Sequence, residues 1–315
     1  MTRIIIDTDP GQDDAVTILL ALASPEIELL GITTVAGNVS LGHTTENALK
    51  TLELAGRTEI PVHPGADRPL RRAPIDASHV HGRTGFEGVE LPAPRLRARE
   101  EPADSFLVRT LMENPPGSIT LCCIGPLTNI ALALQREPRI AERIERIVTM
   151  IGAWSELGNI TPCAEFNAAA DPDAAALVFA SGVPIVVVPL DVTHQLHTSR
   201  ARMERLRALP GGIGAVVADW FAFEKRFEAE KFGTDGGPLH DPNTVLWLLR
   251  PDLYGGRKVN VMFETESALT AGMSVIDWWG VTDRPRNALV LRDVDADGVY
   301  AELTERLGRL ERPSA

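Results

Sequence analysis

The sequence is poor in cysteine and in long apolar runs, and each shortage excludes a class of protein. Three cysteines in 315 residues supply neither a disulfide framework nor the paired spacing of a zinc site. No apolar stretch approaches the ~20 residues of a membrane span, and no charged-then-apolar leader stands at the start. We therefore expect a cytoplasmic protein without a membrane partner, in which Cys122 and Cys123 are small core residues.

Clustered basic charge is also lacking. The chain has 31 Lys and Arg against 43 Asp and Glu, which gives a net charge of -12, and the basic residues are spread along it. This balance argues against nucleic acid or an anionic membrane as a partner. A neutral or cationic small molecule suits the protein better than an anionic one.

What the sequence does contain is a regular alternation of short apolar runs and helical patterns. The runs are residues 3–7, 27–37, 118–125, 146–153 and 184–192, and the helical patterns after them are residues 14–23, 44–56, 126–136, 171–182 and 200–209. Unbroken apolar strands separated by helices are typical of a parallel sheet covered on both faces. The pattern predicts an α/β fold with a mostly parallel central sheet flanked by helices, in one domain over residues 1–315.

Further segments extend this prediction. Residues 64–103 have no clear period, and an irregular stretch of that length in a compact domain is usually functional. Residues 215–232 read as a helix that leads into "GTDGGP". Residues 259–264 and 287–294 read as late strands, and residues 296–310 as a final helix.

The first strand ends in an unusual excess of acid. Asp7, Asp9, Asp13 and Asp14 fall within eight residues, in "DTDPGQDD", at a strand-to-helix junction where open α/β sheets bind ligands. Acidic residues also complement a helix N-terminus, but that explains one or two of them. Close carboxylates otherwise raise one another's pKa unless a cation joins them, and all-oxygen ligands favour Ca²⁺ or Mg²⁺. A third explanation is a haloacid-dehalogenase-like phosphatase with Asp7 and Asp9 as nucleophile and acid, although Gly11 replaces its usual hydroxyl residue.

Further polar residues stand at other predicted junctions, where side chains converge on the same rim of the sheet. They are Asn38, a backbone carbonyl near Ile124, Asn159, Glu165, Asn167, His240 and Asp241. Each also has an ordinary structural explanation. Asn38 suits a turn, Asn167 the start of a helix, and Asp241 an N-cap before a proline. A single histidine such as His240 is more often structural than catalytic.

Six ordered motifs bring these residues together. "DTDPGQDDA", "TTVAGN", "HVHGRTG", "GPLTNIA", "AEFNAAADPDAA" and "HDPNTV" jointly resemble the inosine-uridine-preferring nucleoside hydrolase family, in the family's order and with similar gaps, from residue 3 to at least residue 245. The resemblance implies a Ca²⁺-dependent enzyme that hydrolyses the N-glycosidic bond of ribonucleosides to ribose and free base, as in nucleoside salvage.

The resemblance also implies roles for individual residues. The Ca²⁺ ligands would be Asp9, Asp14, the main-chain carbonyl of Ile124, and Asp241. Asp9 would take a proton from Ca²⁺-bound water, and His240 would be the acid for the departing base, with His81 near it. The residues implied around the sugar are Asp13, Asn38, Met150, Asn159, Glu165, Phe166 and Asn167.

Departures from the family pattern concern the base. Trp154 either stacks on the base or packs where the chain leaves a strand. Phe227 and Phe232 stand where some members carry tyrosine, and a phenyl ring stacks but cannot donate a proton. Purine or pyrimidine preference is left open, as are the phosphatase and a catalytically silent nucleoside-binding module. The family suggests a homodimer or homotetramer.

Overall fold

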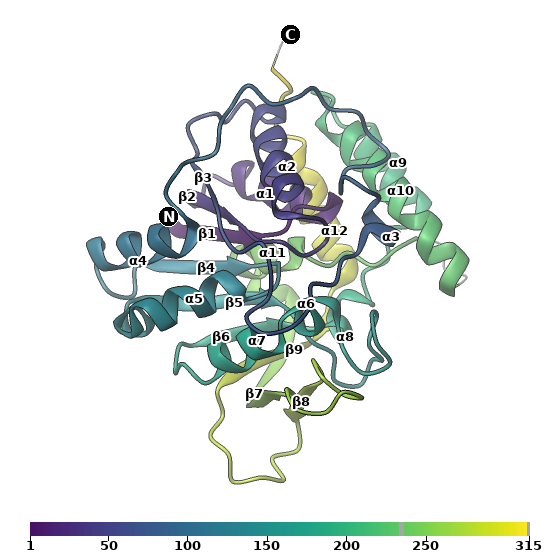
Figure 1. Cartoon of the computed structure of the whole chain (residues 1–315). Helices are drawn as coiled ribbons and strands as arrows, with labels where there is room; N and C mark the ends of the chain where they lie inside the picture. Colours follow the sequence, from purple (N-terminus) through teal and green to yellow (C-terminus); the bar gives the residue numbers. More distant parts are fainter. Residues whose placement is uncertain (233–235, 314–315) are drawn as a thin grey trace.

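The computed structural model describes the backbone of residues 1–232 and 236–313, and the side chains of these residues except 225 and 227–232. Its centre is a nine-stranded sheet in the order β3-β2-β1-β4-β5-β6-β9-β7-β8 (Figure 1). The strands are β1 (Thr2–Thr8), β2 (Ile27–Thr34), β3 (Val62–Pro64), β4 (Ile119–Cys123), β5 (Ile144–Met150), β6 (Ile185–Val188), β7 (Tyr254–Phe263), β8 (Ser274–Asp277) and β9 (Ala288–Val294).

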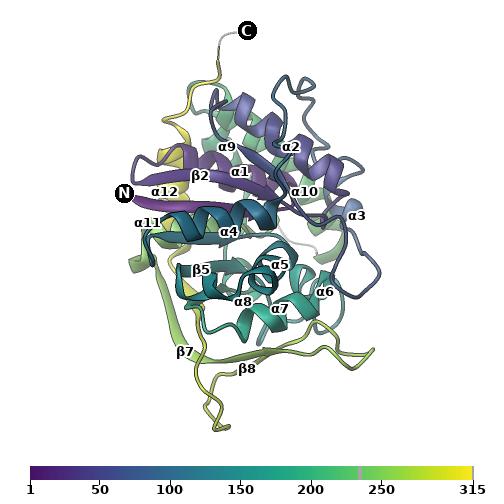
Figure 2. The same cartoon turned by 60° about the vertical axis from the view of Figure 1, so that its left-hand side comes forward.

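The sheet is parallel from β3 to β9 and antiparallel at its far end. β7 pairs antiparallel with both β9 and β8, and both views place this pair at the lower end of the sheet (Figure 2). The predicted mostly parallel α/β sheet is confirmed. The short strands β3 and β8 were not predicted, because three or four residues carry too little periodicity to stand out.

Helices cover both faces of this sheet. They are α1 (Gln12–Leu22), α2 (Leu41–Leu54), α3 (Ser78–His81), α4 (Ala103–Glu113), α5 (Thr128–Arg136), α6 (Phe166–Ala170), α7 (Pro172–Phe179), α8 (Leu190–Thr193), α9 (Arg200–Arg207), α10 (Ile213–Phe232), α11 (Pro242–Leu249) and α12 (Ala296–Leu307), with 3₁₀ turns at Pro138–Glu142 and Pro251–Leu253. Helices α1, α2, α10, α11 and α12 pack on one face, and α4, α5 and α7 on the other.

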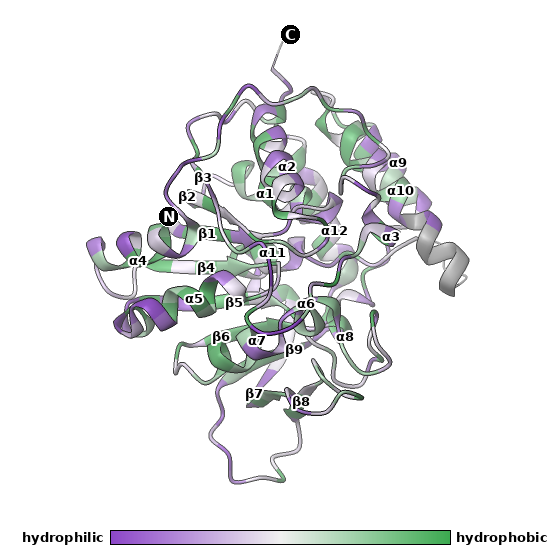
Figure 3. Ribbon diagram, in the orientation of Figure 1, coloured by the Kyte–Doolittle hydropathy of each residue, from purple (hydrophilic) through white to green (hydrophobic). Residues whose placement is uncertain are grey.

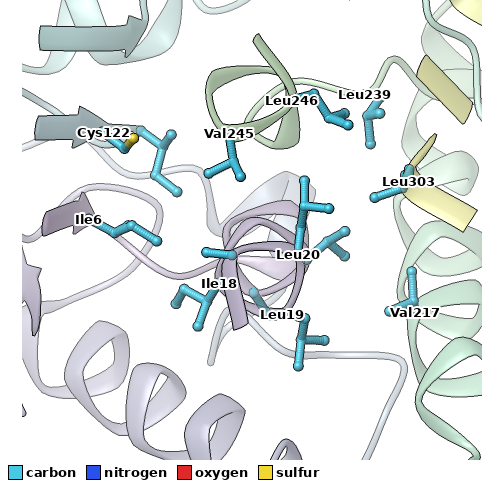
Figure 4. Close-up of a cluster of buried hydrophobic side chains, with 14 of the residues drawn as sticks. Ile6, Ile18, Leu19, Leu20, Cys122, Val217, Leu239, Val245, Leu246 and Leu303 are labelled. Atoms are coloured by element: carbon cyan, nitrogen blue, oxygen red, sulfur yellow. The ribbon is translucent and has the colours of Figure 1, made fainter. Parts of the chain in front are cut away.

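The two cores explain why the strands are apolar without alternation. Successive side chains of a strand point to opposite faces, so Cys122 joins the core under α1 and Cys123 the core under α4. Figure 4 shows Ile6 and Cys122 on the side of the sheet that carries Ile18 and Val245. The prediction that both cysteines are small core residues is confirmed, since both are fully buried.

Hydrophobic residues concentrate along the strands and the inner sides of the helices, and hydrophilic residues on the outer helix surfaces and loops (Figure 3). Within the part of the chain that the structure describes, no helix is both long enough and apolar enough to cross a bilayer. The segment 64–103 is irregular as predicted, apart from α3, and it brings α3 against α10. These two helices border the site described next.

Candidate active site

The site forms where β1, β2, β4 and β5 end, because parallel strands bring their carboxyl ends to one edge. The acidic residues after β1 lie there at the start of α1. Asp14 accepts hydrogen bonds from the Gly11 backbone N–H at 3.0 Å and the Thr8 hydroxyl at 2.5 Å. The Gly11 bond helps to cap α1, so the helix-start explanation holds for Asp14 without accounting for the other three acids.

Asp9 is held between two glycines from separate motifs. A Cβ at Gly37 would lie 2.0 Å from Asp9 Oδ2, and one at Gly125 would lie 2.7 Å from Oδ1. Oδ2 accepts the Asn38 backbone N–H at 2.7 Å. Oδ1 is buried and has no hydrogen-bond partner among the described residues. A buried carboxylate oxygen left in this state requires either a proton or an unseen ligand.

The acidic side chains converge, and no lysine or arginine stands in the described lining of the cavity beside them. Carboxylate oxygens of Asp13, Asp14 and Asp241 lie within 4.8 Å of one another. Burial, and then the charge of Asp13, raises the pKa of Asp14 to about 7. Burial raises the pKa of Asp9 and Asp241 well above the usual range, and neighbouring carboxylates add to the effect. A cation at this position would favour the ionised form of these carboxylates at neutral pH.

Asp241 distinguishes a ligand from a cap. It stands at the N-cap of α11 before Pro242, but its side chain makes no capping hydrogen bond. Instead its carboxylate lies within hydrogen-bonding reach of Asp14. An all-oxygen, buried, acidic donor set fits a hard divalent cation such as Ca²⁺ or Mg²⁺. The alternative explanation of Asp241 as a helix cap is therefore not supported.

A cavity opens above this acidic group. Its described lining comes from α3, α6, α10 and the strand ends, and includes no lysine or arginine. The residues are Asp13, Asn38, Ala77, His79, Val80, His81, Ile124, Met150, Asn159, Ile160, Glu165, Phe166, Asn167, Glu224, Gly237, Pro238, His240 and Asp241. Eleven of the residues expected from the sequence thus share one cavity, and the fully buried Asp9 and Asp14 lie beneath it.

Hydrogen bonds fix which atoms Asn167 offers to this cavity. Its Nδ2 donates to the carbonyls of Ile124 and Met150, both at 3.0 Å. Both amide protons are thereby used, and Oδ1 remains as an acceptor. Asn167 lies in the first turn of α6, as its alternative explanation expected, but it does not cap the helix. The cap is Glu165, whose oxygens accept the backbone N–H groups of Asn167, Ala168 and Gly152.

Asn38 also binds the acidic group rather than acting as a simple turn residue. Its Nδ2 donates to the Asp9 carbonyl and to Asp14 Oδ2, both at 3.2 Å. With the Asn38 backbone N–H on Asp9 Oδ2, one residue therefore orients both carboxylates. The end of β2 is in this way tied to the junction that follows β1.

His240 lies half-buried in the cavity wall beside Asp241. Its Nδ1 is 2.8 Å from the Thr193 hydroxyl of α8, and its ring centre lies 6.0 Å from that of His194. Burial lowers the pKa of His240 to about 4, although the charge of Asp13 acts in the opposite direction. Because His240 lines the cavity, its imidazole is placed for contact with a ligand.

Two residues considered from the sequence lie elsewhere. Asp7 is buried behind the site and accepts hydrogen bonds from Thr33 at 2.5 Å and Asn129 at 2.8 Å, so it does not face the cavity as a phosphatase nucleophile would. Trp154 stacks on Trp278 with ring centres 4.7 Å apart and does not line the cavity. The stack on Trp278 supports the packing alternative for Trp154.

The side chains of Phe227 and Phe232 lie outside the described residues. Other neighbours of the cavity were missed in the sequence. Glu224 of α10 and Thr193 of α8 carry no local motif that marks them. Gln12 is different, since it stands inside "DTDPGQDD" and contacts His81. An uncharged residue between four acids was the available signal.

Sequence comparisons agree with this geometry. The sequence profile of the inosine-uridine preferring nucleoside hydrolase family matches residues 4–301. A Schizosaccharomyces pombe protein described as uncharacterized protein C1683.06c is 63% identical over 308 residues, or 98% of this chain and 99% of its own. A protein of Enterobacter sp. named pyrimidine-specific ribonucleoside hydrolase RihA is 43% identical over 307 residues, or 97% of this chain and 97% of its own.

Solved structures place the fold in the same group. The purine-preferring ribonucleoside hydrolase from Gardnerella vaginalis superposes with a TM-score of 0.91 at 31% identity, over 98% of each chain. The plant nucleoside hydrolase PpNRh1 gives a TM-score of 0.91 at 33% identity, over 98% of this chain and 99% of its own. The fold, the ordered motifs and the acidic cavity thus lead to one assignment: the chain belongs to the inosine-uridine preferring nucleoside hydrolase family and is a ribonucleoside hydrolase.

Proposed function

We propose that this enzyme hydrolyses ribonucleosides with Ca²⁺ held by Asp9, Asp14, Asp241 and the main-chain carbonyl of Ile124. The observation that carries the proposal is the buried acidic group under the cavity, with Asp9 Oδ1 left without a partner. When bound there, the ion would orient sugar hydroxyls and make a nearby water more acidic.

Asp9 is the proposed base. Its Oδ1 is the one carboxylate oxygen of the residue not used by the backbone of Asn38. Glycines on both sides fix its position, so the carboxylate takes a proton from the attacking water without rearranging. A positioned base of this kind contributes roughly 10²–10⁴-fold to a rate.

The remaining chemistry is charge stabilisation and departure of the base. Cleavage of an N-glycosidic bond passes through an oxocarbenium-like sugar, which carboxylates stabilise in a cavity whose described lining has no lysine or arginine. We assign the sugar hydroxyls to Asp13, Asn38, Asn159, Glu165 and the free Oδ1 of Asn167, beside Met150 and Phe166. His240 donates the proton to the leaving base, and it must acquire that proton in the loaded site because burial keeps its pKa low.

Pyrimidine ribonucleosides are the substrates we propose first. The relatives named pyrimidine-specific share 43–44% identity over nearly the whole chain, whereas the solved purine-preferring enzyme shares 31%. As the family suggests, we expect a homodimer or homotetramer.

The direct test is release of ribose from uridine, cytidine, inosine and adenosine, with and without a chelator, followed as reducing sugar. We expect the highest kcat/KM on uridine or cytidine, loss of turnover with chelator, and recovery on adding Ca²⁺. Absence of ribose from all four at high enzyme concentration would contradict the hydrolase, and full activity in chelator would contradict the metal. Recovery with Mg²⁺ but not Ca²⁺ would replace the proposed ion.

A further inference from the structure

Gln12, an uncharged residue of the acidic motif, is hydrogen-bonded to the segment on the far side of the cavity. It is the first residue of α1 and is fully buried. Its Nε2 donates to the backbone carbonyls of His81 at 3.2 Å and Glu87 at 3.1 Å. Two carbonyls facing one end of the amide fix its orientation, since turning the amide over would set three oxygens against one another.

This orientation leaves the amide oxygen of Gln12 facing the His81 ring. Oε1 lies 2.6 Å from His81 Nδ1. An amide oxygen only accepts, so Nδ1 must carry the proton of that hydrogen bond. The second neighbour of Nδ1 leads to the same conclusion, because Glu224 Oε1 is another acceptor, 3.7 Å away.

The absence of a side chain at Gly11 lets the His81 ring lie beside Gln12 and Glu224. A Cβ on Gly11 would lie 2.6 Å from His81 Nδ1 and 2.9 Å from Cε1. The imidazole therefore packs directly on the backbone of the acidic motif. A residue larger than glycine at position 11 would collide with the ring in this position. Its side chain is 12% exposed, and burial lowers the pKa of His81 to about 4. The neutral ring carries one proton.

We propose that Gln12 is a positioning residue that holds His81 in the Nδ1–H tautomer, so that His81 Nε2 accepts a hydrogen bond from an N–H group of the nucleobase. The proposal rests on the proposed function for the presence of a base in the cavity. It assigns His81 to recognition and not to proton donation. Groups of the required chemistry are the ring N–H of uracil or hypoxanthine and the amino group of cytosine or adenine.

The tautomer can be measured without turnover. In protein labelled with ¹⁵N-histidine, long-range ¹H–¹⁵N spectra at pH 7 separate a protonated ring nitrogen from an unprotonated one. The chain has 7 histidines, and His81→Gln identifies the His81 signals. We expect a protonated Nδ1 and an unprotonated Nε2. An Nε2–H tautomer, or two protonated nitrogens, would overturn the proposal even if the enzyme hydrolyses nucleosides as proposed.

Kinetics test the recognition step. Gln12→Leu frees the ring, and we expect kcat/KM on uridine to fall about tenfold, mainly through KM, as for one lost hydrogen bond. Hydrolysis of p-nitrophenyl riboside, whose leaving group has no N–H, should stay within about twofold. Equal losses on both substrates would show that Gln12 supports the acidic group instead and would refute the proposal.

The matched control is Gln195→Leu. Gln195 is an exposed glutamine that also donates Nε2 to two carbonyls, those of Asp191 and Arg292, and it does not line the cavity. Its substitution should leave both substrates and the His81 spectrum unchanged. A His81 tautomer that stays the same in Gln12→Leu would also count against the proposal, because the amide oxygen would then not be what selects it.

Discussion

Carboxylates are arranged in opposite ways at two places in this molecule. Against α12, the buried Arg306 donates to Glu26 at 2.7 and 3.0 Å and to Glu302 at 2.7 Å. That guanidinium lowers the pKa of Glu26 to about 2. At the carboxyl edge of the sheet, the described groups that act on Asp14 are other carboxylates and neutral donors, and its pKa rises to about 7.

The difference shows what the chain leaves for a ligand to supply. A carboxylate that is paired with an arginine is already neutralised and does not require a second cation. The described cavity has no such partner, so its acidic group lowers the free energy of unfolding unless a cation and an electron-poor sugar offset the repulsion. Loss of stability concentrated at one site is common where function depends on it.

The largest expected effect is the loss of activity when an acid of the cavity is removed, compared with removal of an acid that is paired with arginine. Asp9→Ala should lower kcat on every nucleoside by about 10³-fold or more, because base and proposed metal ligand are lost together. Glu302→Gln, in the arginine-paired group, should leave kcat within about twofold. Initial rates of ribose release on uridine and inosine decide it. Comparable losses in the two variants would mean that the contrast between the groups has no bearing on catalysis.

The sequence predicted the sheet and most of the cavity because both depend on local pattern. Apolar runs identified the parallel strands, and strand ends identified Asn38, Asn167 and Asp241. What it could not supply were contacts set by packing between distant elements. The packing of Trp154 could be recognised only from its contact with Trp278, which lies 124 positions further along the chain.

The acidic motif shows the same division within eight residues. The spacing of its carboxylates predicted a site, but it did not reveal that Asp7 faces Thr33 and Asn129. Nor did it reveal that Gln12 orients His81, since their hydrogen bond joins residues 69 positions apart. Which side of the strand end each side chain occupies depends on the neighbouring strands, and these come from later in the chain.

The His240→Ala variant tests whether His240 protonates the leaving base. His240→Ala should lower kcat/KM on natural nucleosides by about 10²-fold, the usual contribution of a general acid. The loss on p-nitrophenyl riboside should be at most a few-fold, because nitrophenolate leaves without a proton. The ratio of the two kcat/KM values is the measurement. Equal losses on both substrates would refute His240 as the acid and leave it a structural histidine.

Adding Ca²⁺ should stabilise the protein through the acidic group beneath the cavity and not through the carboxylates paired with Arg306. At a free Ca²⁺ concentration near a hundred times Kd, the free energy of unfolding should rise by about 2.7 kcal/mol, which raises Tm by roughly 5 °C in a chain of this size. Asp241→Asn should remove most of the shift, whereas Glu302→Gln should retain it. Thermal melts of chelator-treated protein with added Ca²⁺ measure this. A full shift in Asp241→Asn would exclude Asp241 as a ligand.

The smallest expected effect lies in the paired group itself. Because its pKa is lowered, the ionised Glu26 stabilises the fold above pH ~4.5, and this contribution disappears as pH falls toward about 2. Glu26 is half exposed, so Glu26→Gln should cost only about 0.2–1 kcal/mol at pH 7. Urea midpoints of wild type and variant should therefore converge as the pH falls from about 4.5 toward about 2. The exposed pair Glu305–Arg309 supplies the control, since Glu305→Gln should change little at any pH. A wild-type advantage that persists unchanged to pH 3 would show that the Glu26 side chain stabilises α12 by packing rather than by its charge.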